Sequence, residues 1–160
     1  MAYLLDANVF LQAKNLHYGF DFCPAFWDWL KSQNEQGAVF SIEKVKDELA
    51  DDDAAAWAAG CAEGFFLKPD AKVAATLATV SQWVIQQGYE PAAVNTFLQV
   101  ADYYLVAHAL AYGHAVVTHE VPANSVRKVK IPNVCIGLGV KCMTPFEMLR
   151  VERAKFVLGK

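Results

Sequence analysis

Two aspartates in apolar surroundings are the residues of this sequence best suited to chemistry. Asp6 stands between the apolar stretches 3–5 and 9–11, and Asp102 has mostly apolar residues, such as Leu105, at the helical spacings of three and four. A carboxylate in such surroundings is costly to bury unless it is paired or bound to a metal ion. The structural alternative for both is an aspartate that forms a turn or caps a helix. We predict that both are metal ligands.

Two glutamates are candidates for the same site. Glu48 follows Val45 by three residues, which places it on the apolar face of a predicted helix, although the nearby lysines also fit a solvated helical surface. Its neighbour Asp47 is the substitute. Glu120 comes just after the apolar segment 115–118, where an ordinary loop acid is the alternative. We predict that Glu48 and Glu120 complete a set of four carboxylates.

Four converging carboxylates would suit metal-dependent hydrolysis. Mg²⁺ and Mn²⁺ prefer hard oxygen ligands. Two such ions about 4 Å apart can activate a water molecule and stabilise the leaving oxygen of a phosphodiester. Asn8 and Thr118, each two residues from one of the acids, could orient a ligand or donate to a phosphate oxygen. The sequence contains no P-loop and no nucleophile elbow, so it gives no sign of the chemistries that use them.

Short apolar segments predict the strands that would position these acids. Helical segments separate them, which predicts a parallel sheet covered on both faces, with ligands at the carboxyl ends of the strands. Asp6 and Glu120 each fall just after such a segment. We predict one α/β domain over residues 1–160, a three-layer α/β/α fold with a central, mostly parallel sheet of four to five strands. The predicted strands are residues 2–5, 38–40, 65–67, 115–118 and 140–143.

Proline, glycine and capping residues predict where the helices begin and end. Ser41 is expected to cap the helix that carries Glu48. A helical region from Pro91 is expected to continue through Asp102 to Tyr112, with a helix that starts near Asp102 as the alternative. A threonine, a proline and a glutamate at residues 144, 145 and 147 are typical of a capped final helix. Further helices are expected from Pro24 to Gly37 and over residues 71–87.

The charge of the chain gives little sign of a nucleic-acid partner, because its formal net charge is −3. Without the four proposed ligands, however, 13 of the 17 acids remain against 14 Lys and Arg. Affinity for phosphate must then come from local patches and bound ions. Residues 121–131 form a basic segment without periodicity, which predicts a long loop. We predict that Arg127, Lys128 and Lys130 bind a nucleic-acid backbone; a solvated basic loop is the alternative.

Neither a membrane span nor an export signal is predicted. No apolar run approaches the roughly 20 residues that cross a bilayer. Asp6 interrupts the first apolar run, which is unlike a signal peptide. The four cysteines are scattered without close pairs, and the four histidines do not add a structural zinc spacing. We therefore expect a cytoplasmic protein with no membrane association.

The acids and their surroundings resemble those of PIN-domain ribonucleases, in the order of that family and over essentially the whole chain. Residues 4–8 resemble the opening strand, which ends in an acid followed shortly by Ser, Thr or Asn. Glu48 resembles the second acid, on a helix after the second strand. Residues 101–109 resemble the helix of the third acid, and residues 116–120 resemble the fourth strand. Glu120 departs from the aspartate usual there, and the basic loop is longer than expected, which suggests a separate PIN-like branch.

The resemblance implies a three-layer fold and RNA cleavage that depends on Mg²⁺ or Mn²⁺. It implies catalytic and metal-binding roles for Asp6, Glu48, Asp102 and Glu120, with RNA as the substrate held by the basic loop. Many bacterial members are toxins held inactive by a cognate antitoxin protein, and PIN domains commonly pair as homodimers. The aromatic segment from Phe20 to Trp29 is a candidate contact surface.

Two other functions remain open. A phosphatase of the haloacid-dehalogenase type would use Asp6 as a nucleophile, although Asn8 replaces its usual second acid. A catalytically degenerate PIN-like module would instead bind a protein partner through its aromatic surfaces. Trapping a phosphorylated Asp6 would identify the first, and failure to bind Mn²⁺ would identify the second.

Overall fold

A single parallel sheet forms the centre of the protein. The computed structural model describes residues 1–50 and 52–159, and within them five strands pair in the order β3-β2-β1-β4-β5. Every pair of neighbouring strands is parallel, so the predicted α/β class and strand number are confirmed. The strands are β1 (Tyr3–Leu5), β2 (Val39–Ile42), β3 (Phe66–Leu67), β4 (Ala115–Val117) and β5 (Cys142–Met143).

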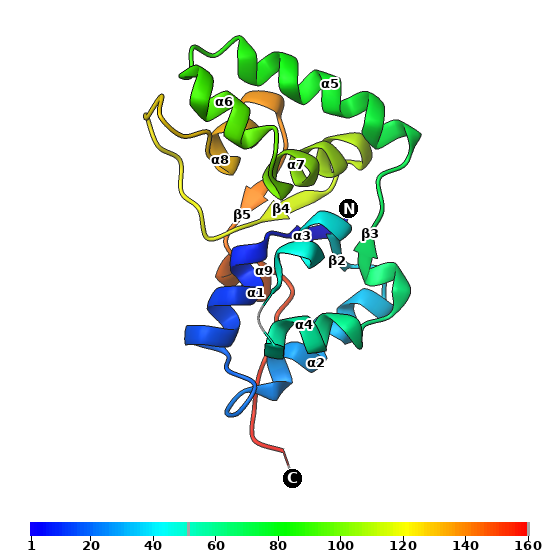
Figure 1. The fold of residues 1–160 in the computed structure, drawn as a ribbon. Coiled ribbons are helices and arrows are strands. Elements are labelled where there is room, and N and C mark those ends of the chain that lie inside the picture. Colours follow the sequence, from blue (N-terminus) through cyan, green and yellow to red (C-terminus); the bar gives the residue numbers. More distant parts are fainter. Residues whose placement is uncertain (51, 160) are drawn as a thin grey trace.

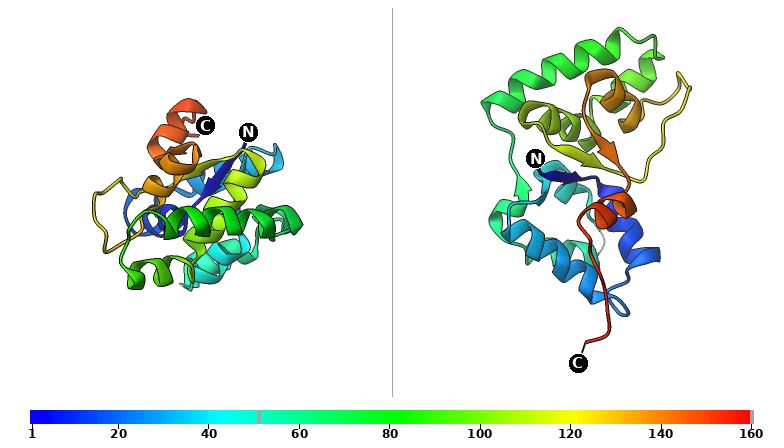
Figure 2. Two further views of the ribbon diagram at one scale, coloured as in Figure 1. Left: turned by 90° about the horizontal axis from the view of Figure 1, so that it is seen from above. Right: turned by 180° about the vertical axis from the view of Figure 1, so that it is seen from behind.

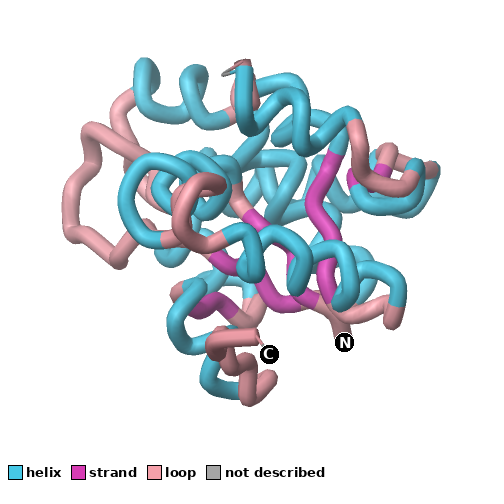
Figure 3. Tube along the Cα trace, turned by 90° about the horizontal axis from the view of Figure 1, so that it is seen from below, coloured by secondary structure: helices cyan, strands magenta, loops and turns pink. Residues whose placement is uncertain are grey.

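Helices cover both faces of this sheet (Figures 1 and 3). Above it in Figure 1 lie α5 (Ala71–Ile85), α6 (Pro91–Phe97), α7 (Ala101–Tyr112) and α8 (Ile131–Leu138). Below it lie α1 (Ala7–Gln12), α2 (Pro24–Glu35), α4 (Asp52–Ala59) and α9 (Pro145–Val151). The short α3 (Glu43–Glu48) contacts α7. A π-helical turn, η1 (Ala13–His17), extends α1. A 3₁₀ turn, η2 (Glu63–Phe65), leads into β3.

The register of the central strands brings two predicted site segments to one edge. Leu5 is paired with Val117, so β1 and β4 end side by side. The backbone N–H of Asp6 donates to the carbonyl of Val117 over 2.9 Å, which continues this pairing by one residue. Asp6 and Thr118 therefore leave the sheet together at its carboxyl edge.

An aromatic core fixes the helices below the sheet. Phe10 of α1 packs against Trp27 of α2, Trp57 of α4 and Phe65, with ring centroids 5.7 to 6.5 Å apart. These contacts assign most of the aromatic segment of α2 to the core. Phe22, whose exposed fraction is 67%, is the large aromatic of that segment that faces solvent.

Three local expectations are wrong. Residues 91–112 form two helices, because the chain is extended at Val100 before α7 begins. Ser41 does not cap α3; its hydroxyl is buried in β2 and donates to the carbonyl of Leu5, so Ile42 occupies the cap position. The basic loop ends one residue before Ile131, where α8 begins.

The capping box of the last helix is confirmed, with Thr144 and Glu147 bonding each other's backbone N–H groups. All four cysteines are free. None of the described helices combines the length and the apolar character needed to cross a membrane.

Candidate active site

Asp6 is the most buried acid of the candidate site, with an exposed fraction of 5%. One carboxylate oxygen, Oδ1, accepts from the backbone N–H of Ala7 over 2.7 Å and so caps α1. The other, Oδ2, accepts from the Thr118 hydroxyl over 2.8 Å. Asp6 therefore does cap a helix, through one of its two oxygens, and its side chain is fixed at the carboxyl edge of the sheet.

Thr118 is the centre of a hydrogen-bond network that links the ends of β1 and β4. Its hydroxyl donates its one hydrogen to Asp6 and accepts from the Asn8 amide over 3.2 Å and the Glu120 backbone N–H over 3.1 Å. The side-chain oxygen Oδ1 of Asn8 accepts from the His119 backbone N–H over 3.2 Å. Because the Thr118 hydroxyl is fully used, Thr118 and Asn8 position the acids in this arrangement.

The other three acids approach from separate elements. Asp102 is half-buried in the first turn of α7. Glu48, the exposed last residue of α3, has its Oε1 atom 3.4 Å from the backbone N–H of Ala101, at the start of the same helix. Glu120 is half-buried, and its Oε2 atom accepts from the backbone N–H of Ile131, at the start of α8, over 2.8 Å. Both glutamates thus meet the positive end of a helix dipole.

The pKa values of the two aspartates show that these acids act on one another. The pKa of Asp6 is raised to about 7, first by burial and then by the charges of Asp102 and Glu120, against the lowering effect of the hydrogen bond from Thr118. The pKa of Asp102 is raised to about 6 by burial, the largest cause, together with repulsion from Glu120 and Glu48. The four predicted acids form one electrostatically coupled cluster, in which Asp47 has no part that the structure reveals.

The donor set of this cluster fits a hard divalent cation. Its ligands are all carboxylate oxygens, which Mg²⁺ and Mn²⁺ prefer, and a cation would relieve their repulsion. In the arrangement observed for residues 1–50 and 52–159, no three His, Cys, Asp or Glu side chains come together closely enough to hold one ion. Glu48 and Glu120 are each bonded to a backbone N–H, so binding would require these long side chains to turn inward or water to bridge.

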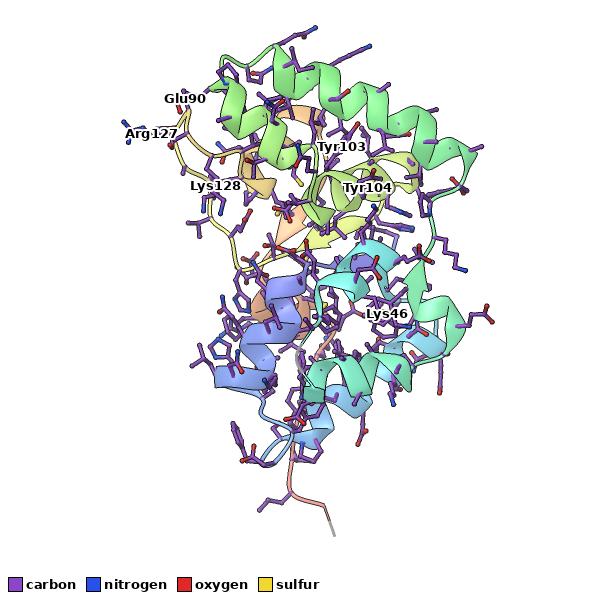
Figure 4. The ribbon with its side chains drawn as sticks, in the orientation of Figure 1. Lys46, Glu90, Tyr103, Tyr104, Arg127 and Lys128 are labelled. Atoms are coloured by element: carbon purple, nitrogen blue, oxygen red, sulfur yellow. The ribbon has the colours of Figure 1, made fainter. Side chains whose placement is uncertain are left out.

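The basic loop borders the cluster and is tied down along its length. The carbonyl of Val126 accepts from the Glu90 backbone N–H over 2.9 Å, and the Asn133 amide makes two hydrogen bonds to the backbone of Ala123. Lys128 lowers the pKa of Asp102, so its charge acts on the acids. Figure 2 shows the loop standing out from one side of the body, and Figure 4 shows Arg127 and Lys128 on it beside α6. Lys130 is half-buried at the cap position of α8.

A cluster of rings that includes His119, the residue before Glu120, was not expected from the sequence. The His119 ring stacks on His17 at 5.6 Å between centroids, and Phe146 lies edge-on to His17 at 5.0 Å. No sequence signal could have joined them, because they come from η1, the end of β4 and α9. The signal for His119 alone was its position next to Glu120.

Comparison with known proteins agrees with the fold and identifies a family. The structure is similar to a chain in the crystal structure of FitAcB from Neisseria gonorrhoeae, with a TM-score of 0.53 and 18% identity over 90% of this chain and 98% of that chain. Among curated proteins, none matches the sequence significantly. The sequence matches the family described as a domain of unknown function (DUF4411) over residues 3–156, and this chain is therefore a member of that family.

Proposed function

We propose that this protein is an endoribonuclease that depends on Mg²⁺ or Mn²⁺ and hydrolyses the phosphodiester bonds of RNA. The observation that carries the proposal is the buried carboxylate of Asp6, held by Thr118 at the carboxyl edge of the sheet within the field of Asp102 and Glu120. Burying several acids that repel one another destabilises a fold, which suggests that they are kept for a function.

Each acid has a role in this proposal. Asp6 and Asp102 would hold the metal, and Glu48 and Glu120 would complete its oxygen ligands. When bound, the metal would supply an activated water and stabilise the leaving oxygen of the phosphodiester. Thr118 and Asn8 link the ends of β1 and β4, so that Asp6 and Glu120 leave the sheet at the same edge.

The resemblance to PIN-domain toxins and the fold shared with the FitAcB chain support a role as the toxin of a toxin–antitoxin pair. A cluster of acids without metal would accept an Arg or Lys from an antitoxin, which offers charge-assisted hydrogen bonds to carboxylates. Phe22 is the exposed aromatic of the segment expected to contact such a partner or a second copy of the chain.

The test is cleavage of single-stranded RNA by the purified protein. We expect cleavage in Mn²⁺, none in excess EDTA, and recovery when Mn²⁺ is restored in excess over the chelator. For the toxin role, expressing the chain alone should slow bacterial growth, and Asp6→Asn or a small protein encoded beside it should relieve the effect. Equal toxicity of wild type and Asp6→Asn would exclude nuclease action as its cause. Cleavage that persists in EDTA would overturn the proposed metal dependence.

The basic loop should contribute affinity rather than chemistry. Replacing Arg127, Lys128 and Lys130 together with Ala should weaken RNA binding for every sequence. It should also flatten the salt dependence, with the log–log slope falling by about 0.7 for each lost contact to a single-strand phosphate. Lys141→Ala is the matched control, because Lys141 is exposed just before β5, at the opposite edge of the sheet. A salt slope equal to that of the wild type would assign the three cations to a merely solvated loop.

A further inference from the structure

A cavity of about 470 Å³ lies directly beside the acids, between α6 and the basic loop. Glu48 and Asp102 form part of its wall, so it opens onto the candidate metal site. Arg127 and Lys128 line it from the loop. The volume is in the range of pockets that hold small ligands, roughly 300 to 1,000 Å³.

The floor of this cavity is apolar and held in place. It includes Phe97, whose exposed fraction is 2%, together with Ala93 and Val129, which are also buried. The Phe97 ring lies 5.8 Å from the ring of Tyr103, and the Tyr103 hydroxyl donates to the carbonyl of Leu77 over 2.7 Å. These buried side chains make the base of the cavity rigid, and the surface that a ligand can touch comes from the more exposed lining residues such as Ala92 and Val100.

The walls are fixed as well. The hydrogen bond from Glu90 to Val126 ties the loop to the residue that precedes α6 (Figure 4). The bond from Ile131 to Glu120 ties the other end of the loop to the acid cluster. The cavity is therefore a built part of the fold, with an apolar floor, cations on one side and acids on the other.

We propose that this cavity receives one unpaired base of an RNA strand, next to the phosphate that is cut. The proposal rests on the proposed function, because it assigns the phosphate of that nucleotide to the acid cluster and its metal. An apolar floor suits the face of a base, and an arginine plane can stack on a base. Lys128 lines the cavity together with Asp102, so it is placed to neutralise the phosphate.

The depth of the cavity decides the class of substrate. A base can enter only if it is unstacked and unpaired, as in single-stranded RNA, loops and bulges. The bases of a regular duplex are paired and stacked, so we expect them to stay outside the cavity. The hydroxyl of Thr96, on the exposed rim, is the neutral polar side-chain group of the lining that could bond a base edge.

The test fills the cavity from its rim, leaving the buried floor unchanged. Ala92 and Thr96 are exposed and line the cavity, whereas Asn95, exposed on the same helix, does not. Each is replaced by Leu, in the double variant Ala92→Leu/Thr96→Leu and in the control Asn95→Leu. Asp6→Asn is present throughout to prevent cleavage, and melting temperatures establish that each variant folds.

Binding is measured by fluorescence anisotropy with a labelled single-stranded RNA of ten nucleotides and with the matching duplex. The double variant should bind the single strand about tenfold more weakly, since a stacked base contributes roughly this much affinity. The control should stay within about twofold, and duplex binding should be equal in all variants. Equal single-strand binding by the double variant and the control would overturn the proposal, as would equal losses for single strand and duplex.

Failure of the base cavity can be told apart from failure of the proposed nuclease function. A wild type that cleaves RNA, combined with a double variant that binds normally, would refute the base cavity alone. A wild type that never cleaves RNA, combined with selective loss of single-strand binding in the double variant, would refute the nuclease and leave the cavity as a binding site for unpaired bases.

Discussion

Replacing Asp102 with Asn is expected to lower metal-dependent RNA cleavage by at least about a hundredfold, and to raise the melting temperature of the metal-free protein at pH 8. The first effect follows because an amide is a poor ligand for Mg²⁺ or Mn²⁺ where a carboxylate is needed, and outer-shell losses alone cost 10- to 100-fold. The second follows because the Asp102 charge is partly buried and repelled by Glu120 and Glu48. Cleavage assays and thermal unfolding in EDTA measure the two effects.

The pair of effects separates a functional acid from a structural one. Asp102 is a better choice than Asp6 for this purpose, because Asp6 also caps α1 and binds Thr118. Asp47→Asn is the matched control; Asp47 is exposed, lies next to Glu48, and should affect neither measurement. A large loss of thermal stability in Asp102→Asn would mark a structural acid. Full retention of activity would remove Asp102 from the site altogether.

The strand-end acids could be placed from the sequence because parallel strands share one carboxyl edge. Asp6 and Glu120 follow apolar segments that pair directly, and one residue of extra pairing carries Asp6 to the Thr118 hydroxyl. Local chemistry also sufficed for the last helix, where Thr144 and Glu147 satisfy each other's backbone within one turn. In both cases the information lies within a few residues or in the general geometry of such sheets.

The break between α6 and α7 could not be placed, because its cause is tertiary. Residues 98–100 contain neither Gly nor Pro, and their side chains are compatible with a helix. The new helix begins at Ala101, where Glu48, 53 residues away in sequence, receives the first backbone N–H. The start of α8 could not be predicted for the same reason, because its first backbone N–H donates to the side chain of Glu120. The cavity beside the acids depends on both helix starts and so was invisible to sequence patterns.

The role of Thr118 shows a similar limit within the site. A strand-end threonine next to an acid could equally donate to a phosphate or to the protein. In the structure the Thr118 hydroxyl donates its hydrogen to Asp6 and accepts hydrogen bonds from the Asn8 amide and the Glu120 backbone N–H. The choice depended on three partners, of which two lie about 110 residues away, so only the folded chain could decide it.

The buried carboxyl group of Asp6 is expected to add stability to the metal-free protein as the pH falls from 8.5 to 6.5. The pKa of Asp6 is raised to about 7 in the folded state from an ordinary value near 3.8. The folded state therefore binds more protons than the unfolded chain in this range, and stability decreases as pH rises. The gain is about 1 kcal/mol, or roughly 3 °C in melting temperature for a domain of this size. Burial lowers the pKa of His108, His114 and His119, which takes stability away as the pH falls toward 6.5, so the contribution of Asp6 is measured as the difference in pH dependence between wild type and Asp6→Asn.

Mn²⁺ should reverse this dependence on pH. Metal ligands must be deprotonated, so Mn²⁺ and protons compete for the same carboxylates. At pH 8.5, Mn²⁺ at a hundred times its Kd should stabilise the protein by about 2.7 kcal/mol, or roughly 8 °C, and the same concentration should do much less at pH 5.5. Asp102→Asn should lose most of the shift and Asp47→Asn none of it. A Mn²⁺ shift of equal size in Asp102→Asn would place the ion away from these acids. A shift that does not weaken in acid would mean that carboxylates with raised pKa values are not its ligands.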